Sequence, residues 1–218
     1  MADVRLYALL DPAVSGEHLP ELAQALVEGG ATLVQLRDKQ GETRRLLAEA
    51  RVLQRVLALH GVPLVINDRV DVALATGADG VHVGQDDMPV EDARRLLGPS
   101  AIIGLSIKTV AQARAAPLDL VNYVGVGGVF ATTSKHNPEP PIGGAGLRTI
   151  VEAIRTRAPA MPIAAIAGID ETNAAEVIAA GADGIAVISA LSRAQDPGAA
   201  ARKLRGIVDR GLRARAGL

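Results

Sequence analysis

Two cationic side chains, Arg37 and Lys39, stand two residues apart at the end of an apolar run that predicts a strand. In an extended segment, residues two apart point to the same side. With Lys135, which falls in a loop rich in hydroxyl groups, they would supply about three positive charges, enough to suit a diphosphate. Without Lys135, the pair is better explained as solvated loop charges. If the three cations converge, we therefore predict a site for a polyanion.

Two carboxylates, Asp68 and Asp87, each follow another apolar run. One or two carboxylates together with substrate phosphates form the usual binding site for Mg²⁺. Each also has an alternative role as a helix N-cap, because helical patterns begin at Arg69 and Pro89. Taken singly, each carboxylate is better explained as a cap. Asp86 is the weaker ligand candidate.

A third group of residues could bind a phosphate through hydroxyl and backbone N–H groups. Thr132, Thr133 and Ser134 precede Lys135, and Gly168 and Ser189 follow the last two predicted strands. A tight turn at Gly168 and a helix cap at Ser189 are the alternatives.

Further polar residues stand at the ends of predicted strands: Gln35, Asn67 and Ser106. His82 lies inside a predicted strand and is interpreted as a core residue with its hydrogen bonds satisfied. No pair of histidines has metal-ligand spacing.

Repeated units of helix, glycine and buried strand must position these residues. Gly181-Ala-Asp-Gly-Ile-Ala-Val-Ile-Ser189 and Gly77-Ala-Asp-Gly-Val-His-Val-Gly84 are two copies of the same pattern. Such recurrence is typical of a parallel α/β sheet. The expected strands are Val4–Leu10, Thr32–Leu36, Pro63–Ile66, Gly80–Val83, Ala101–Leu105, Leu120–Val126, Pro162–Ala167 and Gly184–Ile188. The expected helices are Glu17–Gly29, Glu42–His60, Arg69–Thr76, Pro89–Leu97, Thr109–Ala115, Leu147–Arg157, Thr172–Ala180 with Asp170 as a cap, and a last helix from Asp196-Pro197.

Alternation of eight strands with eight helices favours a closed (β/α)8 TIM barrel over a doubly wound sheet. The 218 residues are few for this fold, so we expect one barrel domain over residues 1–218 with short loops. The active site of such a barrel lies at the carboxyl ends of its strands, where the polar residues above converge. One connection, Gly127–Gly146, is long and therefore predicted to be functional or mobile.

Composition excludes several classes of function. A net charge of −1 gives no electrostatic basis for binding nucleic acid or anionic membrane. The apolar runs are too short to cross a bilayer, and no signal peptide is evident. Cysteine is absent, which fits a cytoplasmic location and excludes thiolate chemistry. Phosphorylated small molecules are the expected substrates, and the sequence leaves open a homo-oligomer.

The chain resembles thiamine-phosphate synthase in motifs that occur in order from the second to the eighth strand. These are Val34-Gln-Leu-Arg-Asp-Lys39, Asn67-Asp-Arg69, Gly80-Val-His-Val-Gly-Gln-Asp-Asp87, Gly104-Leu-Ser106, Thr132-Thr-Ser-Lys135 and Gly184–Ala190. The resemblance implies a transferase that joins a hydroxymethylpyrimidine diphosphate to a thiazole phosphate, giving thiamine phosphate and diphosphate.

The resemblance also implies roles for individual residues. The pyrimidine diphosphate site comprises Gln35, Arg37, Asp38, Lys39, Asn67, Ser106 and Lys135, of which Arg37, Lys39, Ser106 and Lys135 are the expected catalytic residues. The thiazole phosphate site comprises Thr132, Thr133, Ser134, Gly168, Ile188 and Ser189. Asp68 and Asp87 are the implied Mg²⁺ ligands.

This chemistry needs no protein nucleophile, because the aminopyrimidine can delocalise a carbocation formed as diphosphate leaves. The loop ending near Gly143-Gly-Ala-Gly146 is hypothesised to close over the reactants and exclude water. Departures from the family pattern are Lys108 for His, Gly128 for Pro, Ser134 for Thr and Ala167 for Gly.

Three alternatives to the synthase remain at this point. A related thiazole tautomerase is disfavoured because Lys108 replaces the His expected beyond the fifth strand. A sensor of thiazole phosphate would need neither the diphosphate cations nor the metal carboxylates. Another phosphate-using barrel, such as a tryptophan-pathway enzyme, is disfavoured by the paired carboxylates after strands three and four.

Overall fold

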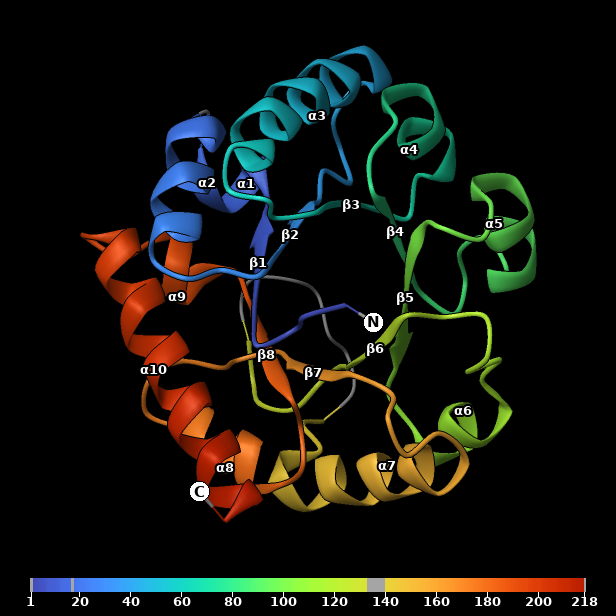
Figure 1. Cartoon of the computed structure of the whole chain (residues 1–218), viewed down its shortest axis with the longest axis vertical. Coiled ribbons are helices and arrows are strands. Elements are labelled where there is room, and N and C mark those ends of the chain that lie inside the picture. The colour runs from blue at the N-terminus through green and yellow to red at the C-terminus, as the bar shows by residue number, and fades with distance from the viewer. Residues whose placement is uncertain (1, 17, 133–139, 218) are drawn as a thin grey trace.

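Eight parallel strands form one closed barrel, in which each strand pairs with the next in chain order and β8 pairs with β1. The computed structural model describes residues 2–16, 18–132 and 140–217. Figure 1 looks down the barrel and shows the helices as an outer ring around the strands. The predicted (β/α)8 fold is confirmed. The strands are β1 (Leu6–Leu10), β2 (Leu33–Leu36), β3 (Leu64–Asn67), β4 (Gly80–Val83), β5 (Ile102–Ile107), β6 (Tyr123–Val126), β7 (Ile163–Ile166) and β8 (Gly184–Val187).

The helices that cover the barrel follow the predicted apolar stripes, with two short additions after β1 and β8. They are α1 (Pro12–Ser15), α2 (Leu19–Glu28), α3 (Thr43–Ala58), α4 (Val70–Thr76), α5 (Val90–Leu97), α6 (Val110–Ala115), α7 (Gly143–Arg157), α8 (Ala174–Ala179), α9 (Ser189–Ser192) and α10 (Pro197–Ala216). The four-residue helices α1 and α9 were not predicted, because so few residues carry no helical period.

Both faces of each strand are buried, which explains the continuous apolar runs in the sequence. In β1, Leu6, Ala8 and Leu10 belong to the outer core between strands and helices. Tyr7 and Leu9 belong to a second apolar cluster inside the barrel. This alternation follows from the two-residue period of a strand. Polar side chains from the second face can therefore reach the barrel interior, where the site is built.

Two local predictions were wrong. Helix α7 begins at Gly143 and not at Leu147, so the last four residues of the predicted long loop form the first helical turn. Glycine is a poor helix former, and three glycines here hid that turn from the pattern. Asp170 does not cap α8, whose N-cap is Asn173; its carboxylate instead accepts hydrogen bonds from the N–H and hydroxyl of Thr172.

The last helix begins as predicted, with Pro197 in its first turn and Asp196 accepting a hydrogen bond from the N–H of Ala199. Within the described ranges, no helix is both long and apolar enough to cross a membrane.

Candidate active site

Arg37 lies at the barrel mouth directly after β2, and its guanidinium forms an ion pair with Asp11 after β1. Both side chains are largely buried, with 15% and 5% of their surface exposed. The second Asp11 oxygen accepts a hydrogen bond from the N–H of Ala13 at 3.0 Å and so caps α1. Asp11 thus fixes the direction of Arg37. It was missed by the sequence analysis, although its place at a strand end was a usable signal.

Lys39, Asp68 and Asp87 meet at the same mouth. The Lys39 Nζ lies 3.1 Å from Asp68 Oδ2, and the carboxyl group of Asp87 is close enough to that of Asp68 to affect its pKa. Burial and the contact with Asp87 raise the pKa of Asp68, against the opposing effect of the Lys39 ammonium. Two carboxyl groups this close favour binding of an extra positive charge.

The capping alternative for these carboxylates is wrong. The N-cap residues of α4 and α5 are Arg69 and Pro89, and neither helix has a side-chain cap. Asp68 has a φ of +60°, a left-handed conformation that Asp tolerates better than most residues. Asp87 accepts a hydrogen bond from the N–H of Gly84 at 2.8 Å, which closes the turn after β4.

A small cavity of about 50 Å³ lies deeper in the barrel and contains several predicted residues. Among its lining residues are Tyr7, Gln35, Arg37, Asn67, His82 and Ser106. His82 is buried and hydrogen bonded to Tyr123 and Ser106, which confirms its interpretation as a satisfied core residue. It nevertheless also lines this cavity.

Tyr7 and Tyr123, the two tyrosines of the chain, were not predicted to belong to the site. Their hydroxyl oxygens lie 2.7 Å apart in the barrel interior. Burial raises the pKa of both phenols, so both keep their protons at neutral pH.

The Asp38 carboxylate makes its described contacts within the turn after β2. Its Oδ1 accepts hydrogen bonds from the N–H groups of Gln40 at 3.1 Å and Gly41 at 2.7 Å. Asp38 therefore shapes the turn that carries Lys39.

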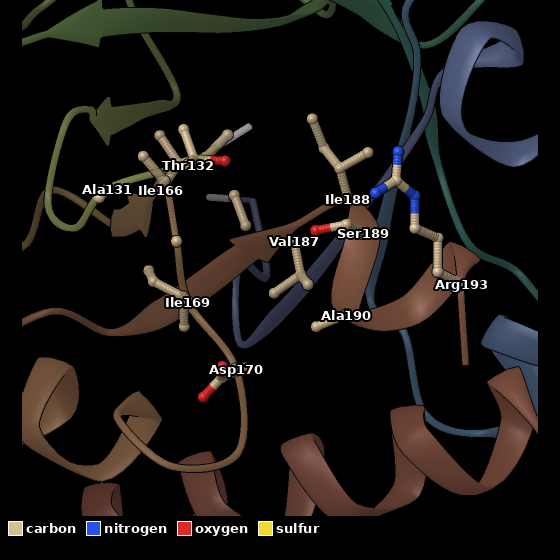
Figure 2. Close-up of a pocket in the computed structure, with 13 residues that line it drawn as sticks. Ala131, Thr132, Ile166, Ile169, Asp170, Val187, Ile188, Ser189, Ala190 and Arg193 are labelled. Carbon is tan, nitrogen blue, oxygen red and sulfur yellow. The ribbon is translucent and has the colours of Figure 1, made fainter. Parts of the chain in front are cut away.

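A larger cavity of about 560 Å³ opens beside the ends of β7 and β8. Figure 2 shows the hydroxyl groups of Thr132 and Ser189 pointing into it from opposite sides, with Ile188 beside Ser189. Arg193, at the end of α9, also lines the cavity and was missed, because α9 itself was not predicted. Hydroxyl groups and a guanidinium are suitable partners for a phosphate.

The turn after β7 is built by an unusual pair of residues. Gly168 has a φ of +63°, and a Cβ at this position would overlap the carbonyl oxygen of Ala131. Ala167 has a φ of +96°, which is strained for a residue with a side chain. The N–H of Phe130 donates to the carbonyl of Ala167 at 3.0 Å, so the turn and the loop after β6 are held together.

The two cavities adjoin, because both are lined by Ile166, Ala186 and Ile188. Ligands in them would lie side by side at the barrel mouth. The predicted residues Thr133, Ser134 and Lys135 lie outside the described residues, as does the middle of the hypothesised lid at 133–139.

The candidate metal site consists of two carboxylates, Asp68 and Asp87. Across residues 2–16, 18–132 and 140–217 there is no group of three or more His, Cys, Asp or Glu that could hold a metal ion. Asp68 and Asp87 alone would leave the remaining positions of an octahedral Mg²⁺ to water and substrate oxygens, as is usual for this ion.

Comparison with known proteins gives a consistent result. A family model described as thiamine monophosphate synthase matches residues 6–191. The thiamine-phosphate synthase of Agrobacterium fabrum is 50% identical over 214 residues, which cover 98% of this chain and 97% of that protein. The thiamine-phosphate synthase of Albidiferax ferrireducens is 52% identical over 208 residues, covering 94% and 92% of the two chains. The structure of thiamine phosphate pyrophosphorylase from Pyrococcus furiosus superimposes with a TM-score of 0.84 at 38% identity, covering 96% and 98%.

Proposed function

The chain belongs to the thiamine monophosphate synthase family, and from this premise we propose how its site carries out the synthase reaction. The family consists of transferases of thiamine biosynthesis. We assign the pyrimidine diphosphate to the small cavity and its cationic rim, and the thiazole phosphate to the larger cavity. The adjoining walls of the two cavities carry this proposal, because the reaction needs both substrates in contact.

The reaction would proceed in two steps. The bond between the pyrimidine methylene carbon and the diphosphate oxygen breaks, and both electrons leave with the diphosphate. The aminopyrimidine delocalises the cation until the thiazole nitrogen donates its lone pair to the methylene carbon and forms the new C–N bond. Arg37 and Lys39 would stabilise the growing charge on the leaving group, with Lys135 as a third expected cation.

The remaining residues would position the substrates. Gln35, Asn67 and Ser106 line the small cavity, where they can hydrogen bond a pyrimidine. Ser189, Gly168 and Thr132 line the larger cavity, where hydroxyl and N–H groups suit a phosphate monoester. Positioning together with charge stabilisation would supply most of the rate enhancement.

Asp68 and Asp87 would hold Mg²⁺ beside the diphosphate. The two carboxyl groups lie close together, and that of Asp68 also pairs with the Lys39 ammonium, so the donor set fits a small divalent cation. When bound, the ion would add positive charge to the leaving diphosphate.

Product formation tests the proposed reaction directly. Purified protein is mixed with the pyrimidine diphosphate, the thiazole phosphate and Mg²⁺, and thiamine phosphate is followed with and without a chelator. We expect product with Mg²⁺ and its loss with the chelator. Absence of product with intact thiazole phosphate binding would contradict the proposal and point to the sensor, and isomerisation of a thiazole substrate would point to the tautomerase.

Three variants test the assignment of the cation site. Asp68→Ala and Lys39→Ala should each lower kcat/KM by roughly one to three decades. Asp68→Ala removes a carboxylate proposed to hold Mg²⁺, and Lys39→Ala removes a positive charge proposed to stabilise the leaving group. Asp119→Ala is the matched control, since it also removes one carboxylate, and Asp119 is exposed before the start of β6, at the end of the barrel opposite the mouth. Equal rates in all three variants and the wild type would remove the metal and diphosphate assignment.

A further inference from the structure

Side chains from five strands form one chain of hydrogen bonds across the barrel interior (Figure 1 shows these strands, β1, β2, β4, β5 and β6). The Gln35 amide nitrogen donates to the Tyr7 hydroxyl, which lies 2.7 Å from the Tyr123 hydroxyl. The Tyr123 hydroxyl is 2.9 Å from His82 Nδ1. His82 Nε2 is 2.9 Å from Ser106 Oγ, which ends the chain.

Counting protons along this chain fixes its direction. An amide nitrogen can only donate, so the Tyr7 oxygen is an acceptor toward Gln35. A buried phenol proton needs an acceptor. Among the described contacts, the acceptor next to the Tyr7 proton is the Tyr123 oxygen, and the acceptor next to the Tyr123 proton is His82 Nδ1. Both phenols hold their protons because burial raises the pKa of each. His82 therefore carries its proton on Nε2 and donates it to Ser106.

The direction of the chain determines what Ser106 can do. Its oxygen is used as an acceptor by His82, so its hydroxyl proton points elsewhere. Ser106 lines the small cavity together with Gln35, Asn67 and Arg37. A ligand in this cavity therefore meets the Ser106 hydroxyl as a hydrogen-bond donor.

One glycine makes the chain sterically feasible. Gly104 of β5 is paired with His82 on one side and with Tyr123 on the other. A Cβ at Gly104 would overlap both the Tyr123 ring and His82 Nδ1. The two side chains thus meet across β5 only because position 104 has no side chain.

We propose that this chain sets the tautomer of His82 and thereby presents Ser106 as a donor to an acceptor atom of the pyrimidine diphosphate. Tyr7 and Tyr123 are then positioning residues that act through Ser106, and Gln35 is the residue that sets the direction. The inference rests on the proposed function for the identity of the ligand, whereas the direction of the chain is a property of the ligand-free protein.

The direction can be measured without any ligand by ¹⁵N NMR of the histidine side chains in the full-length protein. The His82 signals are identified by their loss in His82→Gln. We expect wild-type His82 to carry its proton on Nε2. Gln35→Glu should move it to Nδ1, because a carboxylate accepts from Tyr7 and reverses every bond. A wild-type proton on Nδ1 would overturn the proposal, as would the same tautomer in wild type and a folded Gln35→Glu.

A double-mutant cycle tests whether Tyr7 acts through Ser106. Tyr7→Phe keeps the ring and breaks the chain, and we expect it to lower kcat/KM for the pyrimidine diphosphate about ten-fold. Ser106→Ala should cost at least as much, and the double variant no more than Ser106→Ala alone. The KM for the thiazole phosphate should stay unchanged in all three.

Losses that multiply in the double variant would show that Tyr7 acts independently of Ser106 and would overturn the proposal. Wild-type protein that makes no thiamine phosphate would instead refute the proposed function, and the NMR result would still decide the direction of the chain.

Discussion

Replacing Ala167 with glycine should cost little stability or raise it slightly, although Ala167 is buried. Burial of its methyl group is worth about 0.8 kcal/mol, and the added chain entropy of a glycine costs about 0.5–1 kcal/mol. Relief of the strained φ of +96° should return roughly 1–3 kcal/mol. The opposing effects largely offset each other, so Ala167→Gly should change the free energy of unfolding by between about −1 and +2 kcal/mol.

Ala165→Gly is the matched control for this prediction. Ala165 lies in β7 two residues earlier, is fully buried and has no positive φ. Here the methyl and entropy losses are not offset, so we expect a loss of about 1.5 kcal/mol. Urea unfolding of both variants, with equal m values, measures the difference. Equal destabilisation of the two would show that Ala167 is not strained.

Three further predictions follow from the residues around the site. Gly168→Ala should raise the KM for the thiazole phosphate about ten-fold or more, because its Cβ would displace the loop at Ala131; an unchanged KM would contradict this. Asp11→Asn should raise the KM for the pyrimidine diphosphate by releasing Arg37, while retaining an oxygen that can cap α1; steady-state kinetics and circular dichroism separate the two effects. Hydrogen bonds from Thr172 lower the pKa of Asp170. The stability that this carboxylate adds is therefore present above its unfolded pKa and is lost as pH falls through its folded pKa. When the free energy of unfolding is measured against pH, Asp170→Asn should lose less of it on acidification than the wild type.

The barrel was predictable because its signals are local and repeated. Buried strands give short apolar runs, and glycines such as Gly77 and Gly181 begin the units that contain β4 and β8. The polar residues at strand ends could be found by the same rule, since parallel strands of a barrel end at one face. The rule would also have found Asp11, had it been applied to the first strand.

The interior hydrogen-bond chain could not be predicted in this way. Gln35, Tyr7 and His82 lie inside strands, where a polar residue in the sequence does not reveal which of the two buried faces it occupies. Two of the contacts, Tyr7 with Tyr123 and Tyr123 with His82, join strands that are not neighbours in the sheet. The second depends on the register that places Gly104 between His82 and Tyr123. Such information is tertiary. It appears in the sequence only as a glycine inside a strand, which marks close approach of other groups.

Each half of the site contains one residue with a backbone conformation that neither motif nor composition indicates. Among residues 2–16, 18–132 and 140–217, only Asp68 and Ala167 have a positive φ without being glycine. Asp68 follows β3 beside the expected metal and diphosphate position, and Ala167 follows β7 beside the phosphate cavity. In both cases the positive φ belongs to the first residue after the strand, so the chain changes direction at the barrel mouth. Strain of this kind persists only where the surrounding structure enforces it. The rigid barrel therefore holds two turns in a fixed conformation, and each turn lies beside the position proposed for one substrate.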